Sequence, residues 1–96
     1  MDTDTRLVRV GVGEEFTITV EAVSTAGYRW AEEHDPTMVE LVSAESRPKG
    51  PQVGGATIQE FRLRAVAPGE TTVLLRYKRP WETEARETLT YQVQVI

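Results

Sequence analysis

The chain has 96 residues, a hydrophobic fraction of 40%, a formal net charge of −4 and no cysteine. This length and composition indicate one ordinary soluble domain, whose core is large enough to need no metal or disulfide. The absence of cysteine excludes disulfides, thiolate metal sites and a cysteine nucleophile. Lysine and arginine are scattered without a basic stripe, which argues against nucleic acid or an anionic membrane as a partner.

The beginning of the chain, MDTDTR, is polar and contains no hydrophobic segment of the kind found in signal peptides. No apolar run reaches the length of a membrane-spanning helix. Two locations therefore stay open: the cytoplasm, or a secreted or periplasmic location reached after a leader is removed.

The first half of the chain predicts short strands separated by turns. A strand is expected over residues 7–10, followed by a turn at 11–15 in which two glycines permit positive φ. Residues 16–22 then alternate between apolar and polar side chains, as a half-buried strand does. The positions of this strand that are predicted to face the core are Phe16, Ile18, Val20 and Ala22.

Small residues at 23–27 interrupt this pattern, and we expect a loop there before a second alternation at Tyr28, Trp30 and Glu32. The polar segment that follows, up to Thr37, is expected to be a connection. Residues 38–43 predict a further strand, in which Val39 and Leu41 share one face.

The segment Pro48–Gly55 contains two prolines and three glycines and is predicted to be a surface loop. After it, Phe61, Leu63 and Ala65 lie in phase on one strand face. Ile58 is out of phase with them, which predicts a bulge or a late strand start between Thr57 and Glu60. Pro68 and Gly69 then form a tight turn.

The last third contains strands predicted at 71–78 and 89–95, with Val73, Leu75 and Tyr77 on one face of the first. This strand must end at Pro80, which cannot donate to a sheet. The loop that begins there places Arg79 beside Trp81. Exposed arginine and tryptophan are typical anchors for a protein partner, whereas a tryptophan in this position can also fold back as a lid on the core.

No segment shows a helical period, and about seven short strands are expected. The natural arrangement is an all-β, antiparallel two-layer sandwich forming a single domain over residues 1–96. Successive strands run in opposite directions, so loops that are two strands apart along the chain lie at the same end. This strand parity places the loops 23–27, 48–55 and 79–86 together, where they could form a binding surface. The side chains expected to be largely buried are Trp30, Phe61, Leu75 and Tyr91.

Catalytic and metal-binding patterns are missing from the sequence. The single histidine, His34, lies beside Glu32, Glu33 and Asp35, and we interpret this segment as a solvated acidic turn rather than a metal site. Ser24 and Thr25 have no neighbouring histidine to act as a base, and no glycine-rich phosphate loop is present. The chain is therefore predicted not to be an enzyme and to need no cofactor.

The three loops resemble the chagasin-type inhibitors of papain-like cysteine proteases. That family has Arg-Pro-Trp (or Phe) in the third loop, and here it stands intact at 79–81, with Tyr77 just before it. The second loop of the family, Gly-x-Gly-Gly, corresponds to Gln52-Val53-Gly54-Gly55. The first, Asn-Pro-Thr-Thr-Gly, corresponds to Val23-Ser24-Thr25-Ala26-Gly27 and is followed by an aromatic-x-Trp continuation.

The resemblance implies a monomeric, immunoglobulin-like antiparallel β-sandwich that blocks its protease reversibly and non-covalently, with the first loop over the catalytic cysteine and histidine. The departures at Val23, Ser24 and Ala26 keep a second hypothesis open, a non-inhibitory immunoglobulin-like interaction module. The residues implied to bind the protease are Ser24, Thr25, Ala26, Gly27, Gln52, Val53, Gly54, Gly55, Arg79, Pro80 and Trp81.

Overall fold

A computed structural model of the chain describes residues 3–23, 27–50 and 56–96. Within these ranges the chain is all-β, as predicted, and no helix is long and apolar enough to cross a membrane. The strands are β1 (Thr3–Val10), β2 (Glu15–Val23), β3 (Arg29–Glu33), β4 (Val39–Pro48), β5 (Ala56–Ala65), β6 (Gly69–Lys78) and β7 (Glu87–Val95).

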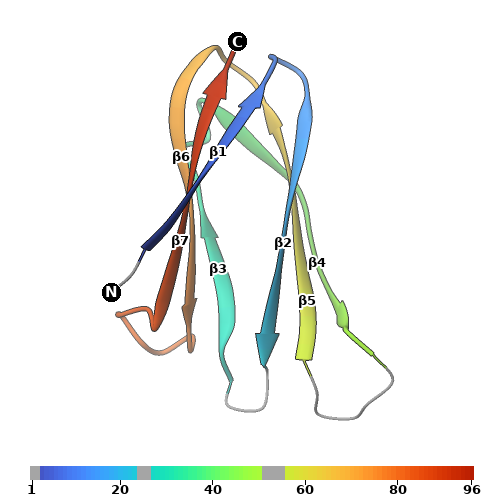
Figure 1. Ribbon diagram of the computed structural model, residues 1–96, viewed down its shortest axis with the longest axis vertical. Coiled ribbons are helices and arrows are strands. Elements are labelled where there is room, and N and C mark those ends of the chain that lie inside the picture. The colour runs from blue at the N-terminus through green and yellow to red at the C-terminus, as the bar shows by residue number, and fades with distance from the viewer. Residues whose placement is uncertain (1–2, 24–26, 51–55) are drawn as a thin grey trace.

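The strands form two sheets that pack face to face (Figure 1). One sheet has the order β1-β7-β6-β3 and the other the order β2-β5-β4. All neighbouring pairs are antiparallel, as predicted, except β1 and β7, which are parallel. In this register Val8 lies opposite Val93 and Val10 opposite Val95, so the apolar positions of both strands match.

The core lies between the two sheets and is built from the inward positions of the alternating strands. Trp30, Phe61, Leu75 and Tyr91 are all buried, which confirms the sequence prediction. Leu63 and Leu75 are completely buried, and burying a side chain of this size contributes roughly 1.5–3 kcal/mol. The remaining buried apolar residues are Ile18, Val20, Ala22, Val39, Ala65, Val73, Leu89, Val93 and Val95.

The bulge or late strand start predicted between Thr57 and Glu60 is wrong, because β5 begins at Ala56 and pairs with β2 in one unbroken register. The inward position next to Phe61 is occupied by Gln59, which is buried although it is polar. Its side-chain oxygen accepts a hydrogen bond from Trp30 N at 2.8 Å, and its nitrogen donates to Trp30 O at 3.2 Å. The strand is therefore continuous, and the polar side chain is satisfied inside the core.

The irregularity lies instead in β4, between Leu41 and Ser43. Leu41 lies opposite Leu63 and Val39 opposite Ala65, so the two share one face as predicted, although Leu41 is 37% exposed. The strand also extends through Pro48, so the loop after it begins later than predicted. Lys49 N donates to Ala56 O at 3.0 Å and closes the base of this loop.

The segment around His34 is a solvated turn only in part: Glu33 and Asp35 are exposed, and Met38 N donates to Asp35 O, whereas Glu32 and His34 are partly buried. Glu32 belongs to β3 in the same phase as Trp30, and its side chain is only 5% exposed. His34 Nδ1 lies 2.6 Å from Glu32 Oε2, so the two side chains pair in a partly buried setting. Among the residues that the structure describes, no group of three potential metal ligands comes together.

Candidate binding site at the loop end

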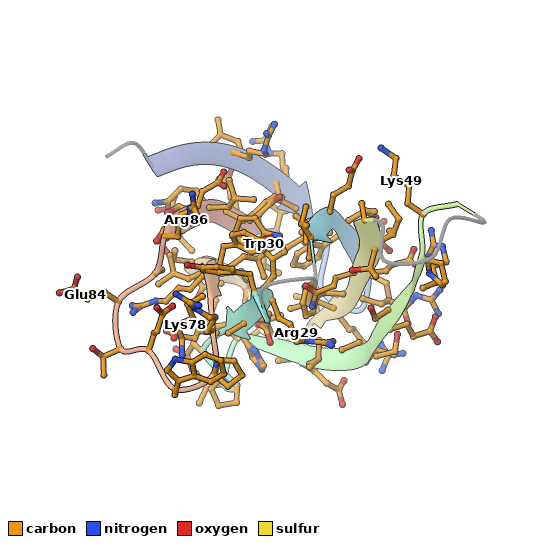
Figure 2. The ribbon with its side chains drawn as sticks, turned by 90° about the horizontal axis from the view of Figure 1, so that it is seen from below. Arg29, Trp30, Lys49, Lys78, Glu84 and Arg86 are labelled. Carbon is orange, nitrogen blue, oxygen red and sulfur yellow. The ribbon has the colours of Figure 1, made fainter. Side chains whose placement is uncertain are left out.

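The ends of β2, β4 and β6 lie at the same end of the sandwich, here called the loop end (Figure 1). Strand parity predicted this arrangement, and the described flanks of all three loops confirm it. Figure 2 looks onto this end and shows Lys78 and Arg86 to one side of Trp30, with Lys49 on the other side. The predicted binding residues Ser24, Thr25, Ala26, Gln52, Val53, Gly54 and Gly55 lie outside the described residues.

Trp81 in the third loop is 71% exposed, so the alternative in which it covers the core is wrong. Its indole ring lies beside the end of the first loop: a β-carbon at Gly27 would be 3.6 Å from Trp81 Cη2 and 3.8 Å from Arg79 Cγ. Gly27 has a φ of 82°, a backbone conformation that suits glycine. The structure therefore brings together the predicted residues of the first and third loops that it describes.

The third loop is closed by bonds between its own residues. Arg79 N donates to Glu82 Oε1 at 3.1 Å, and Glu82 N donates back to Arg79 O at 3.0 Å. The Arg79 guanidinium lies 3.3 Å from the same carboxylate, and Lys78 Nζ donates to Glu82 O at 3.1 Å. At the base, Arg86 N donates to Tyr77 O at 2.7 Å. Pro80 and Trp81 thus lie inside a turn that is closed on both sides.

These bonds favour the ionised form of the Glu82 carboxyl. The backbone N–H of Arg79 lowers the pKa of the Glu82 carboxyl below its ordinary 4.5, and the Arg79 side chain and Lys78 act in the same direction against partial desolvation. The carboxylate is therefore ionised near neutral pH, when it accepts these hydrogen bonds.

An aromatic stack continues from the core to the surface at this end. Tyr77 lies 4.8 Å from Trp30 and 5.2 Å from Tyr28, measured between ring centroids. The guanidinium carbons of Arg79 and Arg86 lie 4.8 Å and 5.4 Å from the Tyr28 ring centre, within range of a cation–π interaction. Sequence reasoning did not assign Tyr28 or Arg86 to the site, although the tyrosine lies directly after the first loop.

The flank near the second loop is held by exposed ion pairs. Lys49 Nζ lies 2.9 Å from Glu21 Oε2, and Arg47 Nη1 lies 3.1 Å from Glu60 Oε1. Exposed pairs of this kind contribute about 0–1 kcal/mol each, so they orient this flank more than they stabilise it.

Comparisons with known proteins point to one family. Residues 9–95 match the model of the chagasin family, described as "Chagasin family peptidase inhibitor I42". A relative, Amoebiasin-2 of Entamoeba histolytica, is 31% identical over 98 aligned residues, which cover 96% of this chain and 79% of that protein.

Two solved structures share the fold. The cysteine protease inhibitor EhICP2 of Entamoeba histolytica superposes with a TM-score of 0.79 at 24% identity, covering 98% of this chain and 97% of the other. PbICP-C, solved in complex with falcipain-2, gives a TM-score of 0.76 at 19% identity, covering 99% and 90%. These likenesses establish the immunoglobulin-like sandwich of chagasin-type inhibitors as the fold of this chain.

Proposed function

This chain belongs to the chagasin family of peptidase inhibitors, and we propose that its loop end covers the active-site cleft of papain-like cysteine proteases. Its function is cysteine protease inhibition, and it is not itself an enzyme. The partner class agrees with PbICP-C, which has the same fold and was solved in complex with falcipain-2.

The observation that supports this mechanism best is the exposure of Trp81. A side chain of this size that is 71% exposed leaves a large apolar surface in water until a partner covers it. Pro80 restricts the backbone before it, and the mutual bonds of Arg79 and Glu82 close the loop around it. Little conformational freedom is then lost on binding, which favours tight association.

In the proposed complex, the first loop enters the cleft above the catalytic cysteine and histidine. Ser24, Thr25, Ala26 and Gly27 are small enough for a narrow groove, and Thr25 offers a hydroxyl group. The second loop, Gln52 to Gly55, would contact one flank with its backbone, and the third loop would contact the other flank. Occlusion of this kind forms no covalent bond, so inhibition is expected to be reversible.

A titration against papain tests the proposal. The folded chain is added to papain with a fluorogenic peptide substrate, and the residual rate is measured before and after dilution. Reversible loss of activity near stoichiometric concentration is the expected result, with recovery on dilution. Undiminished activity at a large excess of the chain would contradict it and would favour the non-inhibitory interaction module, the hypothesis that the departures at Val23, Ser24 and Ala26 support.

A further inference from the structure

The first loop joins two strands that lie in different sheets. It leaves β2 at Val23 and returns at the start of β3, which belongs to the other sheet. No sheet pairing joins β2 to β3 in the described residues, so the two ends of this loop lack the backbone ladder that aligns a hairpin. Their relative position must be set by side chains.

Two side chains span this gap near the N-terminal end of the loop: Trp30 Nε1, on β3, donates to Glu21 O at 2.7 Å, and Tyr77 reaches the last residue of β2. The hydroxyl of Tyr77, on β6, accepts a hydrogen bond from Val23 N at 2.9 Å and lies 3.4 Å from Val23 O, to which it can donate. Val23 is the last residue of β2, and Tyr77 is two residues before Arg79 in the third loop. The contact therefore connects the bases of the first and third loops across the sandwich.

The position of this hydroxyl is itself restricted. Tyr77 lies opposite Trp30 in the β3–β6 register, and its ring packs 4.8 Å from Trp30 and 5.2 Å from Tyr28. A tyrosine has only two side-chain torsions, and the rings of Trp30 and Tyr28 limit both torsions of Tyr77. The hydroxyl is thus held in place before any partner arrives.

We infer that Tyr77 is a positioning residue for inhibition: its hydroxyl fixes Val23, where the first loop begins, relative to Arg79, where the third loop begins. The inference rests on the proposed function. It assigns to Tyr77 no contact with the protease, because the side chain is directed to the backbone of Val23.

Removal of the hydroxyl should affect binding more than folding. Tyr77→Phe keeps the stacked ring, and Val23 is 53% exposed, so water can replace the lost partner. The loop gains freedom that binding must then remove. We expect the inhibition constant against papain to rise about tenfold, the effect of losing roughly one hydrogen bond.

The control is Tyr91→Phe, which removes the same atom from a buried tyrosine on β7 opposite Val73. Inhibition of papain, melting temperature and hydrogen exchange of the Val23 amide are measured for the wild type and both variants. We expect Tyr77→Phe to raise the inhibition constant and speed exchange at Val23 while melting within a few degrees of the wild type. Tyr91→Phe should change neither inhibition nor this exchange rate, whatever its melting temperature.

An inhibition constant for Tyr77→Phe equal to that of an inhibitory wild type would overturn the inference and leave the proposed function intact. A rise matched by Tyr91→Phe would also overturn it, since the effect would then follow general loss of stability. Failure of the wild type to inhibit would remove the proposed function, and exchange at Val23 would then still decide whether Tyr77 holds the loop.

Discussion

The two ends of the sandwich differ in how far side chains, rather than backbone groups alone, connect their elements. At the end opposite the loops, here called the turn end, backbone groups bond to one another across elements. Gly13 N donates to Ala65 O at 2.8 Å, Ala65 N donates to Glu14 O at 2.9 Å, and Val66 N donates to Met38 O at 2.9 Å. Such bonds need glycine where φ is positive, as at Gly13, but few other particular side chains.

At the loop end, side chains make many of the connecting bonds. Gln59 holds the backbone of Trp30, Tyr77 holds that of Val23, and Glu82 holds that of Arg79. The Trp30 indole adds a bond of 2.7 Å to Glu21 O. The geometry of the binding surface therefore depends on individual side chains more than the geometry of the turn end does.

The largest effect expected from a single change is on folding, at the core. Leu63 is completely buried on β5 toward the turn end, so Leu63→Ala should leave a cavity and lower the free energy of unfolding by about 2–5 kcal/mol. Inhibition, measured well below the lower melting temperature, should equal that of the wild type. A raised inhibition constant in the folded variant would show that the two ends are not independent.

Trp81→Ala should produce the converse result. Loss of the exposed indole should weaken protease binding by roughly 2–4 kcal/mol, mainly through faster dissociation, and leave the melting temperature nearly unchanged. Binding kinetics on immobilised protease together with thermal unfolding measure both quantities. An unaltered dissociation rate would remove the third loop from the interface.

Thr25→Ala tests the first loop with a smaller change. A hydroxyl that meets polar groups of the catalytic pair leaves them unmatched when it is removed, which should cost about 1–2 kcal/mol of binding. Folding stability should stay nearly the same. If the inhibition constant does not move, the first loop is not the one that occupies the cleft.

The smallest expected effect is a dependence on pH through Glu82. Its folded pKa lies below the ordinary 4.5, so its contact with Arg79 is complete above about pH 4.5 and is lost as the pH falls through the lower folded value. Affinity should be level above this pH and should decline below it. Calorimetry with a catalytically inactivated protease measures this, and Glu82→Gln should remove the part of the decline that belongs to Glu82. A decline identical in both proteins would assign it to other groups.

Sequence alone determined the all-β class and the inward faces of β2 and β6, because alternation with a period of two is a local property of the chain. It also determined the family, since Arg79-Pro80-Trp81 and the glycine-rich loop patterns are contiguous. Strand parity, which needs only the number of strands between loops, was enough to place the three loops at one end.

Tertiary structure decided which side chains from distant strands meet. Gln59, on β5, faces the core because Trp30, on β3 in the other sheet, offers two backbone groups there. That partner cannot be identified from spacing along one strand. The exposure of Trp81 and the link from Tyr77 to Val23 depend on how the two sheets are placed, and that placement is set by packing of the whole core rather than by any single segment.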